Sequence, residues 1–153
     1  MRCIKKWGIA LAAITASAQF SPADACTRVV YQGKGNTVLT GRTMDWKEDS
    51  RSNLWIFPRG MQRNGEIGKN PLEWTSKYGS VVTSAYDICS TDGMNEKGLA
   101  VSVNMIQDSA SINQSTDKPD ITTTTAIRLL LNKAASVDEA LELLRQYDMH
   151  ASL

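Results

Sequence analysis

The sequence predicts an α+β protein, in which a β-rich amino-terminal part precedes a helical carboxyl-terminal part. Between residues 28 and 106, short runs of β-branched and aromatic residues alternate with glycine-containing turn signals, a pattern typical of strands. Between residues 122 and 144, apolar residues recur at helical spacing in two segments. The apolar faces of these helices need a surface to cover, so we expect a layered sandwich of sheet and helices.

The residue pattern in the first part of the chain predicts one hairpin and one further strand. The runs 28–32 and 36–40 flank a turn signal at residues 33–36, and together they form the hairpin. Residues 54–57 (LWIF) form a strand that Pro58 brings to an end, because proline cannot donate a hydrogen bond to a neighbouring strand.

The residue pattern in the middle of the chain predicts a second hairpin between two loops. The runs 80–88 and 99–106 are rich in β-forming residues and flank the turn-prone segment 92–98. The stretches 61–71 and 107–120 are polar and contain glycine, serine, asparagine or aspartate, so we expect exposed loops there.

Two helices follow these strands. Residues 122–135 carry a cluster of leucine, isoleucine and alanine that indicates a buried helical face. Ser136 and Glu139 form a capping box, in which Ser136 accepts from the Glu139 amide and Glu139 reaches back to the start of the helix. The second helix is expected to bury one face, which consists of Val137, Ala140, Leu141 and Leu144.

The first 25 residues have the pattern of a cleavable secretory signal. Three basic residues among the first six precede a mostly apolar run at 8–18, and residues 23–25 (ADA) match the small-x-small cleavage pattern. A second small-x-small site at residues 16–18 leaves an alternative cleavage point. The apolar run of about 11 residues is shorter than the roughly 20 that a membrane-spanning helix needs. We therefore expect an exported protein, periplasmic or secreted, without a membrane span.

The composition of the chain argues against several classes of function. The chain has 153 residues, with 17 basic and 16 acidic side chains. The leader carries three basic residues and one acidic residue, so residues 26–153 hold 14 against 15, a balance that offers no footprint for nucleic acid. One histidine and no Cys/His cluster argue against a zinc site, and no glycine-rich phosphate loop is present. We expect no metal and no cofactor.

Cleavage after Ala25 would make Cys26 the first residue of the mature protein. An N-terminal cysteine carries a thiol nucleophile and a free α-amine, and an α-amine with a pKa of about 7.7–8.0 can serve as the general base. Three other interpretations remain open. In the first, Cys26 is only a small buried residue; in the second, it forms a disulfide with Cys89. In the third, it is lipidated, as in an envelope lipoprotein or binding module. Lipid processing usually needs a leucine-like residue where this chain has Ala23.

The return strand of the first hairpin brings two charged residues towards Cys26. A turn centred on Lys34 and Gly35 pairs residues whose numbers sum to 69, so Cys26 lies opposite Thr43. A guanidinium at Arg42 beside the sulfur favours the thiolate, and a carboxylate at Asp45 can orient the terminal amine. Residues three apart in a regular strand point to opposite faces, so contact with both requires a bulge, for which Gly41 is a suitable site. A surface ion pair between Arg42 and Asp45 is the alternative interpretation.

Five segments resemble the choloylglycine hydrolase and penicillin V acylase family, and they occur here in the family's order. The segments are CTRVVY at 26–31, GRTMDW at 41–46, FPRG at 57–60, WTSKYGSV at 74–81 and DGMNEKGLA at 92–100. The resemblance covers essentially all of residues 26–153 and implies a four-layer αββα N-terminal nucleophile hydrolase fold. It implies hydrolysis of linear amides such as penicillin V, conjugated bile salts or acyl-homoserine lactones.

The resemblance also assigns roles to individual residues. Cys26 corresponds to the nucleophile, and Arg42 and Asp45 correspond to the arginine and aspartate beside it, at spacings of 16 and 19. Met105 aligns with an oxyanion position that donates a backbone N–H, while a shift of one residue places Asn104 there. Trp46 is expected to line the substrate pocket, although a packed core tryptophan is the alternative. The bulk of Met105 favours a penicillin V acylase over a strict bile salt hydrolase.

Length is the main departure from the family. The resemblance implies a further oxyanion asparagine and a second arginine in a carboxyl half that this sequence does not match. We therefore expect residues 26–153 to form the amino-terminal part of a hydrolase domain whose sandwich is incomplete here. We expect this chain to be inactive by itself, and the complete protein to be a homo-oligomer.

The intact mass of exported material tests the predicted amino terminus. We expect a chain that begins at Cys26 with a free amine and a free thiol. Loss of two hydrogens would indicate a disulfide between Cys26 and Cys89, and an added acyl mass would indicate lipidation. A first residue other than Cys26 would leave the thiol without a terminal amine and contradict the proposed chemistry.

Overall fold

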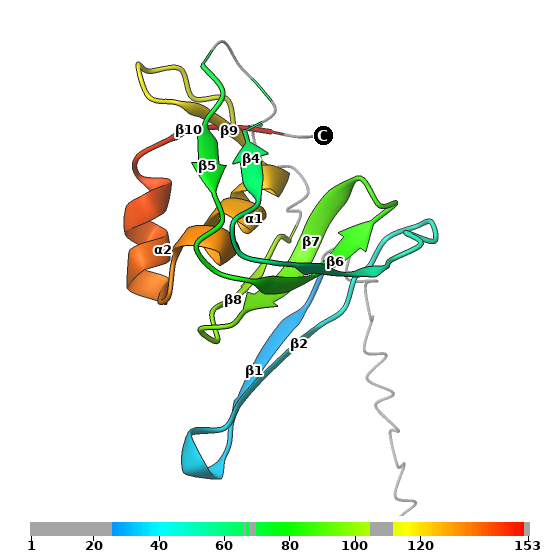
Figure 1. Ribbon diagram of the computed structural model, residues 1–153. Coiled ribbons are helices and arrows are strands. Elements are labelled where there is room, and N and C mark those ends of the chain that lie inside the picture. Colours follow the sequence, from blue (N-terminus) through cyan, green and yellow to red (C-terminus); the bar gives the residue numbers. More distant parts are fainter. Residues whose placement is uncertain (1–25, 66, 68–69, 105–111, 152–153) are drawn as a thin grey trace, which may run out of the picture.

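A computed structural model of the chain describes residues 26–65, 67, 70–104 and 112–151. Its centre is a four-stranded antiparallel sheet in the order β3-β6-β7-β8. Helix α1 covers one face of this sheet, and the hairpin β1-β2 projects from the other side (Figure 1). The strands are β1 (Arg28–Gln32), β2 (Val38–Arg42), β3 (Leu54–Phe57), β4 (Gln62–Asn64), β5 (Glu73–Thr75), β6 (Ser80–Ala85), β7 (Cys89–Asn95), β8 (Ala100–Ser102), β9 (Asp120–Thr122) and β10 (Asp148–His150); the helices are η1 (Lys34–Asn36), α1 (Thr123–Lys133) and α2 (Val137–Leu144).

The two faces of the central sheet carry different side chains. On β7, Gly93 and Asn95 face α1, whereas Asp92 and Met94 point to the hairpin side. Leu131 of α1 packs with Val82 of the sheet, and both are essentially buried. The described residues therefore place α1 on one side of the central sheet and the hairpin on the other.

Helix α1 is fixed at both ends. The Thr122 side chain accepts a hydrogen bond from the Thr125 N–H at 3.0 Å and caps the amino terminus. At the other end, the buried Asn95 side chain donates to the carbonyls of Leu131 and Ala134 at 2.9 and 2.8 Å. Asn95 thereby ties the last turn of the helix to β7 and satisfies carbonyls that a helix end leaves unpaired.

Two smaller sheets lie beside the helices. Strand β4 pairs antiparallel with β5, and β9 pairs in parallel with β10. Trp74 of β5 packs against Ile121, Ala126 and Leu129 in a buried cluster, and its indole N–H donates to Asn132 Oδ1 at 3.1 Å. This cluster joins the small sheets to α1.

Three of the motif segments meet beside the central sheet. Arg59 follows β3 and Glu96 follows β7, and their side chains form a two-pronged ion pair whose Nε–Oε1 distance is 2.6 Å. Glu96 also accepts from the Gly79 N–H at 3.0 Å. Hydrogen bonds from Arg59 and then Gly79 hold the pKa of Glu96 below its ordinary value.

The α+β class, the first hairpin, the strand at 54–57 and both helices are confirmed. The second hairpin is wrong in its placement: the chain turns at residues 86–88 and again at 96–99, and β7 runs through most of the segment expected to be a turn. Tyr86 and Asp87 make the first of these turns in the left-handed conformation, with φ of 54° and 55°. The pair lacks the glycine that usually indicates such a turn in a sequence. The expected loop at 61–71 contains β4, and that at 107–120 reaches β9.

The capping box of α2 is confirmed with one difference. Ser136 accepts from the Glu139 N–H at 3.2 Å, but Glu139 reaches back to the Ala135 N–H rather than to that of Ser136. The expected buried face is only partly correct. Ala140 is buried, whereas Val137 is 64% exposed and Leu141 is 49% exposed, because α2 packs against α1 through one edge of that face.

Substitution of Gly93 tests how closely α1 approaches the sheet. A Cβ at this position would lie 2.7 Å from Leu131 Cδ1 and 2.8 Å from the Val81 carbonyl oxygen. We expect Gly93→Ala to lower the free energy of unfolding by about 1–3 kcal/mol, measured by urea denaturation.

Gly41→Ala is the matched control for this substitution. Gly41 also lies in a strand, and a Cβ there meets no atom within 4 Å. We expect Gly41→Ala to leave stability unchanged or to raise it by up to about 1 kcal/mol. Equal effects of the two substitutions would contradict the described packing of α1 on β7.

Candidate active site

The hairpin β1-β2 places Arg42 beside Cys26. Residues pair so that their numbers sum to 70, with Arg28 opposite Arg42, and the Thr43 N–H donates to the Thr27 carbonyl at 2.9 Å. The predicted register, which summed to 69, is therefore wrong by one residue. The turn is centred on Gly35, because Gly35 and Asn36 both adopt left-handed conformations with φ of 67° and 61°.

This change of register removes the need for a bulge at Gly41. Cys26 lies two residues from Arg28, and Arg28 pairs with Arg42, so all three share one face of the hairpin. Gly41 pairs regularly with Val29, and the predicted bulge there is wrong. The guanidinium of Arg42 reaches the sulfur directly, with Nη2 at 3.5 Å from Cys26 Sγ.

A bulge does occur nearby, in β7. Thr83 pairs with Asp92 and Ser84 pairs with Ser90, so Thr91 is an extra residue on that strand. The Thr91 carbonyl accepts from the Val103 N–H at 3.0 Å and also from Arg42 Nη1 at 3.1 Å. The irregularity in the central sheet is thus at the point where the arginine of the hairpin docks.

Backbone oxygens hold Arg42 in place. Nη1 donates to the carbonyls of Thr91 and Val103, the latter at 2.9 Å, and Nε donates to the Thr43 carbonyl at 3.3 Å. The Asp92 carboxylate lies 4.0 Å from Nε, and the Arg42 side chain is only 10% exposed. With Nη1 and Nε occupied by these acceptors, Nη2 is aimed at the sulfur of Cys26.

Asp45 is linked to the start of the chain through a threonine. Thr43 Oγ1 donates to Asp45 Oδ2 at 3.1 Å, and the same hydroxyl accepts from the Thr27 N–H at 3.1 Å. Strand β2 ends at Arg42, so Asp45 lies beyond the regular pairing. The structure therefore connects the carboxylate to the residue after Cys26, through a hydroxyl that the sequence analysis did not identify.

Trp46 lies at the rim of this region. It is 40% exposed, and its indole N–H donates to the Tyr86 hydroxyl at 3.0 Å. Asp87, next to Tyr86 in the turn, accepts from Asn53, Trp55 and Ser84, and these hydrogen bonds hold the pKa of its carboxyl below the ordinary value. The network fixes the turn that presents Tyr86 to Trp46.

The two candidate oxyanion residues differ in what the structure describes. Asn104 is exposed and follows Val103, whose carbonyl holds Arg42, so the chain passes beside the site at this point. Met105 lies outside the described residues.

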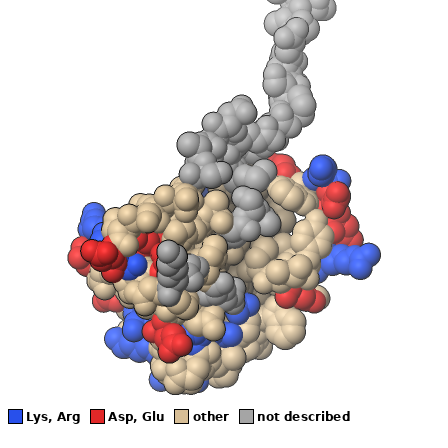
Figure 2. Space-filling model, turned by 90° about the horizontal axis from the view of Figure 1, so that it is seen from above, with Lys and Arg blue, Asp and Glu red and all other residues tan. Residues whose placement is uncertain are grey.

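Cys26 and Cys89 are both free thiols, so the alternative disulfide between them is not formed. Within the described ranges, no group of three or more histidine, cysteine, aspartate or glutamate side chains is placed to hold a metal ion. No helix of the described part of the chain is long and apolar enough to cross a membrane. Figure 2 shows basic and acidic residues interspersed on the face that it presents.

The sequence did not indicate two backbone carbonyls and two side chains of the site. The carbonyls of Thr91 and Val103 hold Arg42, and a carbonyl carries no signature in a sequence. Asp92 offered a detectable signal, because it belongs to the DGMNEKGLA segment, yet it was assigned to a turn. Thr43 lies between the two charged residues that were identified, and its hydroxyl joins Asp45 to Thr27.

Comparison with known proteins gives consistent matches. The family model of linear amide C–N hydrolases, choloylglycine hydrolase family, matches residues 26–152. A penicillin V acylase of Pectobacterium atrosepticum is 43% identical over 131 residues, which cover 80% of this chain and 35% of that protein. The solved structure of a penicillin V acylase from Agrobacterium tumefaciens matches with a TM-score of 0.74 and 44% identity, over 82% of this chain and 40% of that one.

Structures of conjugated bile acid hydrolase from Clostridium perfringens match less closely. Two of them share 25% sequence identity with this chain, with TM-scores of 0.63 and 0.61, over 84% and 80% of this chain and 40% and 38% of theirs. The chain therefore spans little more than a third of the length of the relatives that it matches. The family model covers all of the described residues, and the chain belongs to the choloylglycine hydrolase family of linear amide C–N hydrolases.

Proposed function

We propose that the protein hydrolyses linear amide bonds with Cys26 as an N-terminal nucleophile. The observation that carries this proposal is the 3.5 Å contact between Arg42 Nη2 and Cys26 Sγ, made by an arginine that three backbone carbonyls hold in place. A fixed cation in contact with a sulfur stabilises the negative charge that develops on it during nucleophilic attack. Membership of an amide hydrolase family supplies the class of bond.

The reaction proceeds in two stages once the bond before Cys26 is cleaved. Cys26 Sγ attacks the amide carbonyl carbon while the α-amine of Cys26 takes the thiol proton. The tetrahedral intermediate then collapses, the C–N bond breaks, and the amine leaves with the proton from the α-ammonium. Water, activated by the same α-amine, attacks the thioester and releases the carboxylic acid and the free thiol.

Arg42 and Asp45 act on different groups of Cys26, its thiol and its α-amine. Arg42 stabilises the sulfur as it becomes anionic and when it leaves from the thioester. Asp45 orients the new amino terminus through the chain of contacts from its carboxylate by way of Thr43 to Thr27. The two bile acid hydrolase structures are a Cys-to-Ala mutant and an Arg-to-Leu variant, substituted sixteen positions apart, which is also the separation of Cys26 and Arg42.

The oxyanion of the intermediate needs hydrogen-bond donors where charge develops. Asn104 or the backbone N–H of Met105 would supply one of them, because both positions directly follow Val103, whose carbonyl holds Arg42. The relatives are more than twice as long as the matched segment, and we propose that the part of the fold beyond this chain supplies the second donor.

Penicillin V is the substrate that we favour. The chain shares 43–44% identity with two penicillin V acylases and 25% with the bile acid hydrolase structures. Trp46 and Tyr86, both 40% exposed, offer an aromatic wall near the site that suits an aromatic acyl group. Parallel assays of penicillin V, glycocholate and a long-chain acyl-homoserine lactone distinguish the three substrate classes. Higher kcat/KM for glycocholate than for penicillin V would overturn this preference.

The leader pattern supports export to the periplasm or the medium, because the proposed chemistry needs the amino terminus that its removal creates. An exported lipoprotein or binding module with a modified Cys26 is the alternative from another class. Intact-mass analysis, as described for the predicted amino terminus, separates the two.

Substitution of the nucleophile tests the proposal. We expect Cys26→Ala in the intact protein to lower kcat for penicillin V by at least about 10³-fold, because the substitution removes the sulfur on which the proposed acyl-enzyme forms. Cys89→Ala is the matched control and is expected to retain activity, because Arg42 Nη2 contacts the sulfur of Cys26, whereas the sulfur of Cys89 contacts the Ala85 carbonyl. Amide hydrolysis by Cys26→Ala at the original rate would exclude the proposal.

The reactivity of the thiol tests the role of Arg42. We expect Arg42→Gln to slow alkylation of Cys26 by iodoacetamide at pH 7 by about 3- to 10-fold, because the guanidinium that contacts the sulfur and stabilises negative charge on it is lost. Peptide mapping follows Cys26 and Cys89 separately, with Cys89 as the internal reference.

Arg28→Gln is the control for the structural effect of that substitution. Arg28 also joins the hairpin to the sheet, through Ser102 Oγ at 2.5 Å, and its side chain bonds Thr40 rather than the sulfur. If Arg28→Gln slowed alkylation as much as Arg42→Gln does, Arg42 would act only by holding the hairpin, and its proposed role would be wrong.

A further inference from the structure

Residues 43–53 connect β2 to β3 as a loop with neither helix nor strand. The loop starts directly after β2 and carries Asp45 and Trp46, two residues that the proposed function uses. The hairpin holds its first residue, because the Thr43 N–H donates to the Thr27 carbonyl at 2.9 Å. The regular pairing of β2 ends before this loop, so contacts with other elements have to fix Trp46.

The turn at residues 86–88, between β6 and β7, supplies such contacts. The Tyr86 N–H donates to the Ser50 carbonyl at 2.7 Å, in the middle of the loop. The hydroxyl of the same tyrosine accepts from the Trp46 indole N–H at 3.0 Å. One residue of the turn therefore binds the loop through both its backbone and its side chain.

The Asp87 carboxylate joins this turn to three other segments. Asn53 at the end of the loop donates its side-chain amide to both carboxylate oxygens, at 3.0 and 2.8 Å. The Trp55 indole of β3 and the Ser84 hydroxyl of β6 donate to Oδ1 at 3.0 and 2.8 Å. These hydrogen bonds, that of Asn53 foremost, hold the pKa of the Asp87 carboxyl below its ordinary value, so the turn is built around the anionic form.

The backbone of this turn is strained. Tyr86 and Asp87 both adopt the left-handed conformation, with φ of 54° and 55°. Residues other than glycine rarely adopt it, and the surrounding contacts have to offset its cost in free energy. The hydrogen bonds to the Asp87 carboxylate are contacts of this kind. Their loss would let the turn relax and carry the Tyr86 hydroxyl away from Trp46.

We propose that Asp87 is a positioning residue, which fixes the place of Trp46 beside the active site through the turn and Tyr86. The inference rests on the proposed function in one respect, namely that Trp46 contacts the acyl group of penicillin V. The effect of Asp87 falls on substrate binding, because other residues make the contacts that hold the Cys26 thiol and the Asp45 carboxylate.

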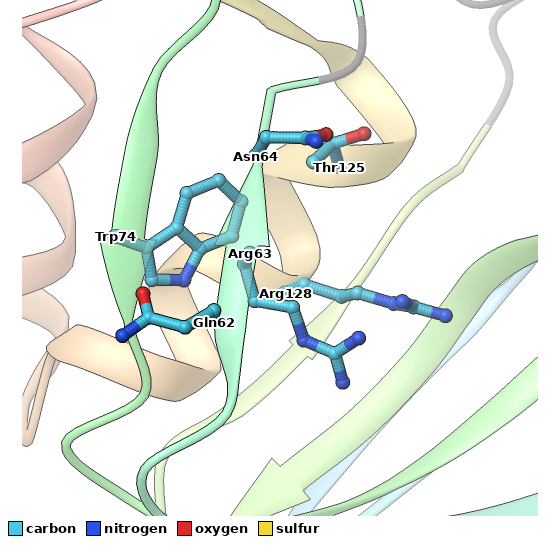
Figure 3. Close-up of a pocket in the computed structure, with 6 residues that line it drawn as sticks. All are labelled: Gln62, Arg63, Asn64, Trp74, Thr125 and Arg128. Atoms are coloured by element: carbon cyan, nitrogen blue, oxygen red, sulfur yellow. The ribbon is translucent and has the colours of Figure 1, made fainter.

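The indole N–H signals in ¹H–¹⁵N spectra test this positioning without a substrate. Residues 26–153 contain three tryptophans, and each of them donates its indole N–H: Trp46 to Tyr86, Trp55 to Asp87 and Trp74 to Asn132. Trp74 lines a pocket between β4, β5 and α1, and it serves as the internal reference (Figure 3).

Asp87→Asn is the variant for this experiment, because it puts a second amide donor opposite the side-chain amide of Asn53. Trp55 contacts Asp87 directly, so its signal reports the loss of the local hydrogen bonds. We expect the Trp46 signal to move as well and the Trp74 signal to stay in place. If the Trp46 signal of the folded variant stayed in place, the proposal would be wrong.

Kinetics with the intact protein test the consequence for the substrate. We expect Asp87→Asn to raise KM for penicillin V by about 3- to 10-fold and to change kcat by less than about twofold, since a positioning contact is lost while the thiol stays in place. Tyr86→Phe removes only the hydroxyl that holds the Trp46 indole, and we expect it to raise KM in the same direction. It also serves if Asp87→Asn fails to fold.

Asp138→Asn is the matched control, since it removes the same charge from an exposed position on α2. We expect it to leave both KM and kcat unchanged. An unchanged KM in the folded Asp87 variant, or a loss confined to kcat, would overturn the positioning role. If the unaltered protein failed to hydrolyse penicillin V, the proposed function would be wrong, and the Trp46 signal alone would decide the role of Asp87.

Discussion

The side chain of Arg42 is the link on which the arrangement of hairpin, central sheet and nucleophile depends. The hairpin buries little of itself in the described structure: Val29, Tyr31 and Leu39 on its outer face are each about 60% exposed. Polar contacts to the sheet therefore set its position, from Arg42 to the carbonyls beside β7 and β8 and from Arg28 to Ser102. The same guanidinium that joins two layers also reaches Cys26. Structure and proposed chemistry rest on one residue.

The rigidity of the surrounding sheet explains why such a link can hold a reactive group in place. Gly93 lets Leu131 of α1 approach the sheet closely, and Asn95 ties the end of α1 to the same strand. Strand β7 is thus fixed from the helix side, and its bulge at Thr91 offers a carbonyl to Arg42 on the other side. Pre-positioned groups of this kind need no rearrangement when charge develops on the sulfur.

Side-chain patterns allowed part of this to be predicted. The return of Arg42 to the neighbourhood of Cys26 was predicted from the hairpin, and the strand at 54–57 and both helices were predicted from their sequence patterns. The register of the first hairpin was missed because Asn36 joins Gly35 in a left-handed conformation and moves the centre of the turn. The strands β4, β5, β9 and β10 have three residues each, too few for a periodic pattern. The carbonyls that hold Arg42 belong to the backbone and have no residue signature.

Trapping of the acyl-enzyme is the most direct test of the central claim, that Cys26 is a nucleophile held by Arg42. The intact protein is mixed with penicillin V, quenched in acid within the first turnovers, digested and mapped by mass spectrometry. The account predicts the acyl group of penicillin V as a thioester on Cys26, which hydroxylamine removes. Turnover of penicillin V with the acyl group on another residue, or with no acyl group on Cys26 under conditions that preserve thioesters, would contradict it.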